Sequence, residues 1–423
     1  MSAGRRGTVI AGAGLAGVRT AQTLRDLGYE GRIRLFSEES ELPYDRPPLS
    51  KAYLTGRRGG EAIRFEDRLD AYTARGIELV LGKRVVAADL SAGTVGLADG
   101  SEAGFDRLVV ATGSRPREPA ALPPSPTVHY LRTAADSRRL AGALTAGRRV
   151  VLVGGGFIGL EVACAARALG CEVTVVEAVA LPLATAVGEE PARRLMSWHT
   201  ARGIAFRCGV TVRSASAAAG ARILRLDDGS QVTADVVVVG VGVVRDTGWL
   251  STAGLGIHHG LVCDHDGRAS DPAVFGVGDV VCRHDGTRSD GTGRSGETGE
   301  RGETGGSGAC RPIGHWTAAA DSAVRVAGTI TGGAPAPVQD DGFFWSDQGD
   351  LRLQFAGYSG PGSEAAVVSG ALDADAFVVH YTDRGRLTGV FAANSPREFL
   401  RGRMALRSAS GAGLARTAEG SGT

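Results

Sequence analysis

The stretch Thr8-Val9-Ile10-Ala11-Gly12-Ala13-Gly14-Leu15-Ala16-Gly17 decides how this chain folds. A short apolar run leads into glycines spaced G-x-G-x-x-G, and apolar residues at helical spacing follow through Leu27. This order predicts a buried parallel strand, a tight turn and a helix. Gly12 allows the turn, Gly14 lets a phosphate approach the backbone, and Gly17 lets helix and strand pack closely. The unpaired N–H groups at the helix start suit a pyrophosphate.

The same pattern occurs a second time. Another apolar run leads into Gly154, Gly156 and Gly159, again followed by a helix and a further apolar strand. A glutamate closes the second strand of each copy, Glu38 in the first and Glu177 in the second. A carboxylate at that place binds the ribose hydroxyl groups of a dinucleotide. The chain is therefore predicted to hold two dinucleotides, and it most simply passes electrons between them.

The second glutamate also indicates which nicotinamide cofactor is used. A carboxylate repels a 2′-phosphate, and no arginine occurs in residues 178–180, so Glu177 favours NADH over NADPH. The structural alternatives are a glycine-rich turn without a ligand and, for Glu177, a solvated acid at a strand end.

The composition argues against a nucleic-acid-binding, membrane-spanning or metal-binding protein. The chain has 423 residues and a net charge of +1, so nothing points to nucleic acid or an anionic membrane. No apolar run approaches the roughly 20 residues of a membrane helix. The six cysteines are scattered without a C-x-x-C pair or metal-like clustering, so we expect no metal site. We interpret the cysteines as reduced thiols or small core residues of a cytoplasmic protein.

The order of elements predicts an α/β fold with two Rossmann-like domains and an α+β C-terminal cap. We place an FAD-binding domain at residues 1–113 and 240–332 and an NADH-binding domain at 114–239. The cap covers 333–407, with a disordered tail at 408–423. Residues 284–309 are rich in glycine and polar residues, which indicates a disordered loop inside the first domain.

Several motifs together resemble the FAD-dependent, NADH-using ferredoxin reductases, which include the reductase components of dioxygenases and share a glutathione-reductase-like fold. The most discriminating motifs are Tyr44-Asp45-Arg46-Pro47-Pro48-Leu49-Ser50-Lys51 and Phe344-Trp345-Ser346-Asp347-Gln348. The others are the two glycine fingerprints, Ala111-Thr112-Gly113 and Val277-Gly278-Asp279. The resemblance covers residues 7–405 and implies FAD in the first site and NADH in the second.

The resemblance also implies roles for particular residues. Besides the glycines of the first fingerprint, the residues implied to contact FAD are Ala16, Glu38, Lys51, Val85, Arg132, Asp279 and Trp316. Asp279 would bind the ribityl chain, and the helix that starts at Trp316 would direct its positive end at the flavin. The structural alternatives are a turn aspartate and a core tryptophan.

Lys51 and Glu161 resemble the family's ion pair beside the flavin nitrogen that accepts hydride. A buried pair is costly unless well matched, so its presence at a site suggests a catalytic purpose. An adjacent ammonium would stabilise the reduced flavin. The alternative for Glu161 is an acid in the first turn of its helix, where it favours the helix dipole.

The exit route for electrons follows from a missing feature. Disulfide reductases of this fold carry two cysteines after the proline-rich segment, but residues 49–55 have none. Electrons are therefore expected to leave the flavin edge singly, with Trp345 near that edge. A basic run could receive an acidic ferredoxin or be a solvated helix face; its residues are Arg397, Arg401, Arg403 and Arg407.

We therefore predict a reductase that takes hydride from NADH onto FAD and passes single electrons to a ferredoxin-type iron–sulfur protein feeding a monooxygenase or dioxygenase. One alternative is an NADH oxidase or a nitrite or quinone reductase of the same fold. Another is a flavin-binding redox sensor without turnover. Thr185 stands where relatives carry an arginine, which leaves the strength of NADH binding open.

Overall fold

The computed structural model describes residues 6–218, 220–284, 310–312, 314–333, 341–360 and 362–418. The chain divides into two compact units, each assembled from three sequence segments. Unit 1 comprises Met1–Asp45, Arg64–Arg115 and Arg245–Asp340, and unit 2 comprises Arg46–Ile63, Pro116–Val244 and Asp341–Thr423. The loop predicted over 284–309 lies outside the described residues, apart from His284. The predicted domain boundaries stay predictions.

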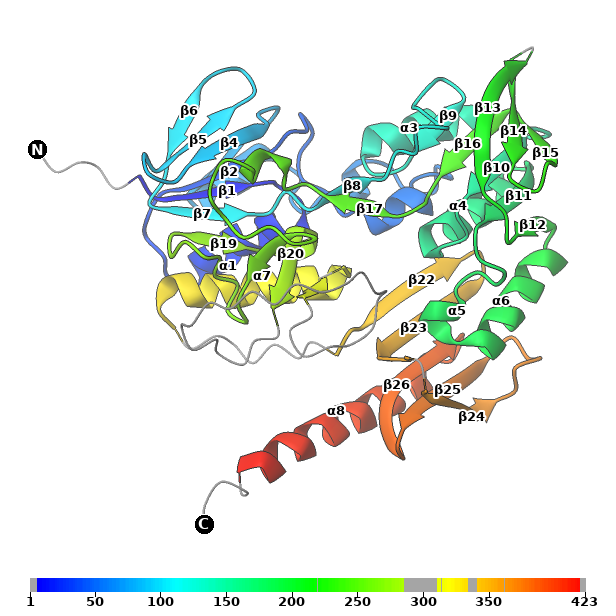
Figure 1. Cartoon of the computed structure of the whole chain (residues 1–423). Coiled ribbons are helices and arrows are strands. Elements are labelled where there is room, and N and C mark those ends of the chain that lie inside the picture. The colour runs from blue at the N-terminus through cyan, green and yellow to red at the C-terminus, as the bar shows by residue number, and fades with distance from the viewer. Residues whose placement is uncertain are drawn as a thin grey trace, which may run out of the picture. The chain divides into compact units, whose positions relative to one another are not determined.

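A five-stranded parallel sheet forms the centre of unit 1. Its strands, in spatial order, are β19 (Val274–Gly276), β7 (Arg107–Val110), β1 (Thr8–Ala11), β2 (Ile33–Phe36) and β3 (Ile77–Val80). Ile10 packs with helices α1 (Leu15–Asp26) and α7 (Trp316–Thr331), which lie side by side (Figure 1). Val9 and Ala11 pack on the opposite side with a small antiparallel sheet. Because both faces are covered, these strands are apolar along their whole length.

The remaining elements of unit 1 surround this sheet. The small antiparallel sheet consists of β4 (Val85–Asp89), β5 (Thr94–Leu97) and β6 (Glu102–Gly104). A second small sheet consists of β18 (Leu261–Cys263), β20 (Val281–His284) and β21 (Cys310–Pro312), and helix α2 spans Leu69–Ala74. Strands β8 (Ser114–Pro116) and β17 (Val243–Arg245) carry the chain between the two units.

Unit 2 repeats the parallel sheet, as the duplicated motif predicts. Its strands, in spatial order, are β12 (Ile204–Cys208), β11 (Glu172–Glu177), β10 (Arg149–Val153), β16 (Val236–Val239) and β9 (Val128–Tyr130). Its helices are α3 (Ala134–Ala143), α4 (Phe157–Ala168), α5 (Ala184–Val187) and α6 (Glu189–Ala201). An antiparallel sheet of β13 (Val212–Ala218), β14 (Ala221–Leu226) and β15 (Gln231–Ala234) covers one face, packing Leu224 against Val237.

The C-terminal part of unit 2 is an antiparallel sheet with one long helix. The strands, in spatial order, are β22 (Phe344–Gln348), β23 (Leu351–Gly357), β26 (Arg386–Ala393), β25 (Phe377–Asp383) and β24 (Glu364–Gly370). One core joins this sheet to the parallel one, since Leu152 and Leu160 belong to the same buried cluster as Leu353 and Phe377. The shared core explains why the cap and the second Rossmann-like domain form one unit.

Helix α8 (Pro396–Ala418) differs from the expected end of the chain. The composition predicted a disordered tail from residue 408, whereas the helix continues to Ala418. Four of the eleven residues 408–418 are alanine, which has the highest helix propensity.

The first half of α8 is tied to the segment before β22 by a partly buried carboxylate. Arg403 donates to both oxygens of Asp341 at 2.7 and 2.9 Å, and Arg407 adds a bond at 2.8 Å. Burial opposes ionisation of Asp341, but the hydrogen bonds and charges of the two arginines outweigh it and hold its pKa below the usual range. Two of the four arginines of the basic run therefore have an internal partner.

Replacing Asp341 tests how much this contact stabilises the unit. Because the folded-state pKa is depressed, the contribution is present above the unfolded pKa of about 4 and is lost as the pH falls through the folded value. We expect Asp341→Asn to lower the free energy of unfolding by about 1–3 kcal/mol at pH 7, and by less at pH 3.5. Urea unfolding followed by circular dichroism measures this. Asp375→Asn, which removes a 70% exposed partner of Arg194, is the control, and equal losses in both variants would contradict the prediction.

Candidate functional site

The first glycine fingerprint forms a turn in which each glycine has a separate steric reason. Gly12 has a φ of +110°, and a Cβ there would lie 2.3 Å from the carbonyl oxygen of Ala111. A Cβ on Gly17 would lie 1.9 Å from the carbonyl oxygen of Gly12. A Cβ on Gly14 would meet nothing within 4 Å, so open space lies before the start of α1. We call these three glycines with the first turn of α1 the first cradle.

The start of α1 has the properties that a pyrophosphate requires. Gly14 is the N-cap residue, no side chain of the described residues caps this end, and the first turn contains no acidic residue. The backbone N–H groups and the positive end of the helix dipole are thus left for an external anion. The residues fit the dinucleotide that the sequence predicts.

Unit 1 contains five further residues that the sequence linked to FAD. Glu38 follows β2, and its side chain is 64% exposed. Its carboxylate lies 3.4 Å from the guanidinium of Arg84. Asp279 accepts a hydrogen bond from Ser114 at 3.0 Å. The Trp316 indole N–H donates to Asp45 at 2.7 Å, which fixes the ring at the start of α7. The other two, Ala16 and Val85, are buried at the starts of α1 and β4.

The second fingerprint repeats the first in backbone detail. Gly154 has a φ of +107°, and its Cβ would lie 2.3 Å from the carbonyl oxygen of Gly240. A Cβ on Gly159 would lie 2.3 Å from the carbonyl oxygen of Gly154, while one on Gly156 would meet nothing within 4 Å. Gly156 caps α4 without a side-chain bond from the described residues. We call these three glycines with the first turn of α4 the second cradle.

Glu177 lies against the second cradle. Its carboxylate accepts hydrogen bonds from the backbone N–H of Gly155 at 2.6 Å and of Val179 at 3.0 Å. These bonds hold a negative charge beside the turn, where a ribose would lie and a 2′-phosphate would be repelled. Thr185, in α5, is exposed.

Lys51, which is partly buried, and Glu161, which is buried, form an ion pair within unit 2. The Lys51 ammonium lies 2.8 Å from Glu161 Oε2, with side chains that are 19% and 5% exposed. Lys51 also donates to the carbonyl oxygen of Pro47 at 3.1 Å. Glu161 lies beyond the first turn of α4, so the alternative of a first-turn acid does not apply.

Two serines complete the surroundings of the Glu161 carboxylate. Ser50 donates to Oε2 at 2.5 Å, and Ser346 donates to Oε1 at 2.6 Å. Sequence reasoning missed both serines as site residues. The alternation in Phe344-Trp345-Ser346-Asp347-Gln348 was the available signal, because two polar residues at every second position of a strand share one face.

The other predicted residues of unit 2 lie apart from this carboxylate. The backbone N–H of Arg132 donates to Asp136 at 3.1 Å, and its carbonyl accepts from the guanidinium of Arg46. Trp345 is on β22, partly exposed, with its ring 6.1 Å from that of Phe343 in a stacked arrangement. Lys51 and Arg132 thus belong to unit 2, whereas the other residues implied for FAD belong to unit 1.

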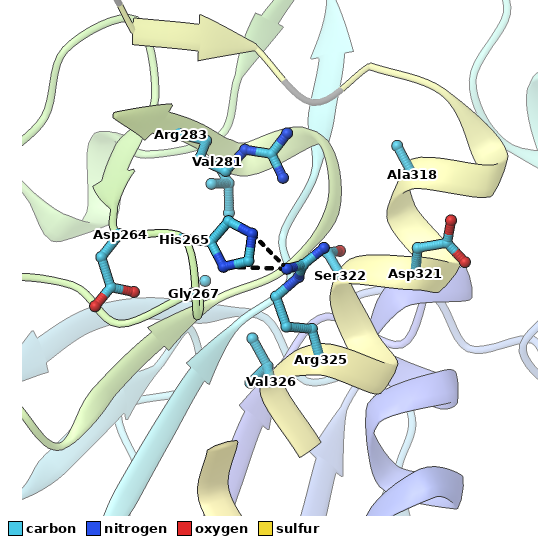
Figure 2. A pocket seen from close by; sticks show the side chains of 11 residues that line it. Asp264, His265, Gly267, Val281, Arg283, Ala318, Asp321, Ser322, Arg325 and Val326 are labelled. Carbon is cyan, nitrogen blue, oxygen red and sulfur yellow. Dashed lines mark hydrogen bonds between the residues drawn. The ribbon is translucent and has the colours of Figure 1, made fainter. Parts of the chain in front are cut away.

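A small cavity in unit 1 lies outside both cradles (Figure 2). It has a volume of about 20 Å³, enough for roughly one water molecule. Arg325 on α7 directs its guanidinium at the ring of His265, with nitrogen distances of 2.8 and 3.1 Å (Figure 2). None of the predicted site residues lines this cavity, and it is too small for a dinucleotide.

One cysteine departs from the expectation of reduced thiols. Cys282 is disulfide-bonded, whereas Cys164, Cys171, Cys208 and Cys263 are free. The antiparallel pairing of β20 with β21 brings together segments far apart in the sequence, which no local pattern reveals. Within the described ranges, no group of three or more His, Cys, Asp or Glu side chains is placed to hold a metal ion. Among the helices described, none has the length and apolar character needed to cross a membrane.

Comparisons with known proteins agree with this geometry. Residues 7–321 match the family "Pyridine nucleotide-disulphide oxidoreductase", and residues 343–421 match "Reductase C-terminal". The chain is 38% identical to the probable ferredoxin reductase CtmF of Castellaniella defragrans, over 95% of this chain and 94% of that protein. It is 36% identical to the ferredoxin–NAD(+) reductase component of the p-cumate 2,3-dioxygenase system of Pseudomonas putida, over 92% of this chain and 90% of that protein.

A solved structure shows the same architecture. Putidaredoxin reductase, in its covalent complex with putidaredoxin, matches with a TM-score of 0.85 and 31% identity, over 95% of this chain and 92% of that chain. The chain belongs to the pyridine nucleotide-disulphide oxidoreductase family. Within it, the chain is one of the FAD-dependent, NADH-using ferredoxin reductases, which confirms the predicted fold class, enzyme class and cofactors.

Substitutions at two glycines of the first cradle distinguish an effect on ligand binding from an effect on folding. Gly14 has a φ of −71° and an unobstructed Cβ position, so Gly14→Ala should fold normally but lose FAD, because its methyl group occupies the path of the phosphates. Gly17→Ala should lose both FAD and native structure, because its Cβ would overlap a backbone carbonyl. The ratio of flavin to protein absorbance and circular dichroism measure these outcomes. Gly142→Ala, with nothing within 4 Å, is the control; full FAD content in Gly14→Ala would show that the cradle is wrongly assigned.

Proposed function

We propose that this enzyme accepts hydride from NADH and delivers single electrons to a ferredoxin-type iron–sulfur protein that feeds a monooxygenase or dioxygenase. Bound FAD would take up two electrons as hydride and release them one at a time. The observation that carries the proposal is a buried Lys51–Glu161 pair in a chain with two dinucleotide cradles. Residues 49–55 contain no cysteine, so a dithiol route is not available there.

We assign FAD to the first cradle and NADH to the second. For FAD, the backbone of Gly12, Gly14 and Gly17 would hold the pyrophosphate, and Glu38 the ribose. The remaining residues proposed to contact FAD are Ala16, Lys51, Val85, Arg132, Asp279 and Trp316. For NADH, Gly154, Gly156 and Gly159 would hold the pyrophosphate and Glu177 the ribose. The open Cβ positions at Gly14 and Gly156 leave room for a pyrophosphate in each cradle.

Lys51 is proposed to stabilise the negative charge that arrives with the hydride. Its ammonium has three N–H donors, of which Glu161 and Pro47 accept two. Glu161 holds the ammonium in place without leaving a buried carboxylate unpaired. A charge fixed before the reaction stabilises a developing anion without reorganisation.

Removing the Lys51 side chain tests this role. We expect Lys51→Ala to retain FAD but to slow reduction of the flavin by NADH by about 100-fold, the usual effect of losing one fixed electrostatic group. Stopped-flow absorbance of the flavin measures the rate. Lys83→Ala is a matched control, because Lys83 is the other lysine of the chain and pairs with Asp99 at the surface. An unchanged rate in Lys51→Ala would remove Lys51 from the mechanism.

Glu177 is proposed to set the preference for NADH. In Glu177→Gln the carboxamide lacks the charge that repels a 2′-phosphate, and its NH₂ group cannot accept the bonds from Gly155 or Val179. We expect the ratio of kcat/KM for NADH to that for NADPH to fall about tenfold, which corresponds to roughly 1.4 kcal/mol. Steady-state kinetics with both cofactors measure it. A ratio equal to that of the unaltered enzyme would assign Glu177 to the structure of the turn alone.

The electron-accepting partner is proposed to dock on the C-terminal part of unit 2. Trp345 offers a partly exposed aromatic ring, and Arg397 and Arg401 are exposed on α8. Arg403 and Arg407 are held by Asp341, so the surface is less basic than the sequence indicated. NADH-driven cytochrome c reduction that requires added ferredoxin distinguishes this function from an oxidase or a small-molecule reductase. If NADH does not bleach the bound flavin, the remaining alternative is a flavin-binding redox sensor without turnover.

We place the enzyme in the cytoplasm, where the proposed donor NADH is formed. The disulfide at Cys282 argues against this placement, because disulfides are rare in reducing compartments. Cell fractionation settles the location directly, and recovery of the protein outside the cytoplasm would overturn the placement.

A further inference from the structure

A continuous chain of buried hydrogen bonds runs from Glu161 into the core of unit 2. Ser346 donates to Glu161, and the side-chain NH₂ of Gln348 donates to the Ser346 hydroxyl at 3.1 Å. Gln348 Oε1 lies 2.8 Å from His199 Nε2, and Cys164 Sγ lies 3.7 Å from His199 Nδ1. Glu161, Ser346, Gln348 and His199 are each at most 5% exposed.

The chemistry of the groups fixes the direction of every bond in this chain. Burial lowers the pKa of His199 to about 4, so the ring is neutral at pH 7. Burial raises the pKa of Cys164 to about 12, so the thiol keeps its proton and donates to Nδ1. The proton of the neutral ring is then on Nε2 and faces the carbonyl oxygen of Gln348. Each group donates toward Glu161, and bonds aligned in one direction strengthen one another.

A buried carboxylate needs such donors to remain in a fixed place. Water is excluded around Glu161, and an ion pair alone does not offset the loss of solvation of both charges. Ser346 occupies Oε1, while Lys51 and Ser50 share Oε2. The chain therefore fixes which oxygen faces the ammonium. The strand alternation of β22 places Ser346 and Gln348 on the same inward face, which links the C-terminal sheet to the pair.

We propose that Ser346, Gln348 and His199 are positioning residues that orient the Glu161 carboxylate, and through it the Lys51 ammonium, for flavin reduction. This inference rests on the proposed function of the ion pair. None of the three touches Lys51 in the structure, so they act through Glu161. Loss of a link should weaken the orientation most when the link is closest to the carboxylate.

The amino-acid composition of the protein offers a direct probe of the Lys51 ammonium. Lys51 and Lys83 are its only lysines, so protein grown with ε-¹³C-lysine gives two resonances, and Lys83→Arg assigns them. The FAD-loaded enzyme is used throughout. The variants are Ser346→Ala, Gln348→Met and His199→Phe, and Ser346→Thr is the rescue because it keeps the hydroxyl. Tyr381→Phe is the matched control, since it removes another buried hydroxyl of the same sheet, bonded to the Val187 carbonyl at 2.5 Å.

Two measurements on each variant test the proposal. We expect Ser346→Ala to move the Lys51 resonance and to slow flavin reduction by NADH about tenfold. Smaller effects should follow in the order Gln348→Met and His199→Phe. The Lys83 resonance should stay fixed, and Ser346→Thr and Tyr381→Phe should match the unaltered enzyme in both measurements.

The outcomes separate this inference from the function on which it rests. If NADH fails to bleach the unaltered enzyme, the proposed function is wrong, and the resonances still report whether the chain orients Lys51. If bleaching is normal and Ser346→Ala behaves like Tyr381→Phe, the positioning role is wrong. Should Ser346→Ala lose its fold, Gln348→Met, which keeps Ser346, carries the test. If all three variants unfold, the hydrogen-bond chain has a purely structural role, and the proposal is overturned.

Discussion

The buried carboxyl group of Glu161, which is contacted from two other segments of unit 2, is the constraint on which the site depends. A charge that is 5% exposed must be surrounded by donors, and four side chains provide or support them: Lys51, Ser50, Ser346 and Gln348. The donors come from two segments, the proline-rich segment and β22, and the carboxylate comes from a third, α4. The carboxylate that we propose to hold Lys51 for the chemistry therefore also joins these three segments. Removing one partner of such a pair costs more than the pair contributes, because the other charge remains buried.

The two cradles share one backbone geometry, which we propose serves two different dinucleotides. Gly12 and Gly154 adopt the same positive φ, and the glycines at the helix starts face open space in both. The carboxylates that follow are used differently. Glu177 accepts two backbone N–H bonds and lies against its own turn, whereas Glu38 is exposed beside Arg84. A fixed charge suits selection against a phosphate, while an exposed one is free to turn toward a ribose.

Much of the fold could be predicted from short-range patterns. Apolar runs of about four residues, helical spacing and paired glycines located both parallel sheets, and the helix expected to start at Trp316 is α7. The site was predicted less completely. Lys51 and Glu161 were paired by resemblance, but Ser50, His199 and the inward role of Ser346 and Gln348 were missed. The bond from Ser346 to Glu161 joins residues 185 positions apart, and no local period encodes such a contact.

The sequence by itself determined the elements whose cause is local. A glycine at positive φ, a strand covered on both faces and a capless helix start follow from steric and hydrogen-bonding rules that act within a few residues. Tertiary structure alone decided the partners of the charged and polar groups. It placed Arg403 and Arg407 on Asp341, closed a disulfide at Cys282, and aligned the donors behind Glu161. Such partners depend on the convergence of distant segments, because burial makes an unpaired polar group too costly to leave alone.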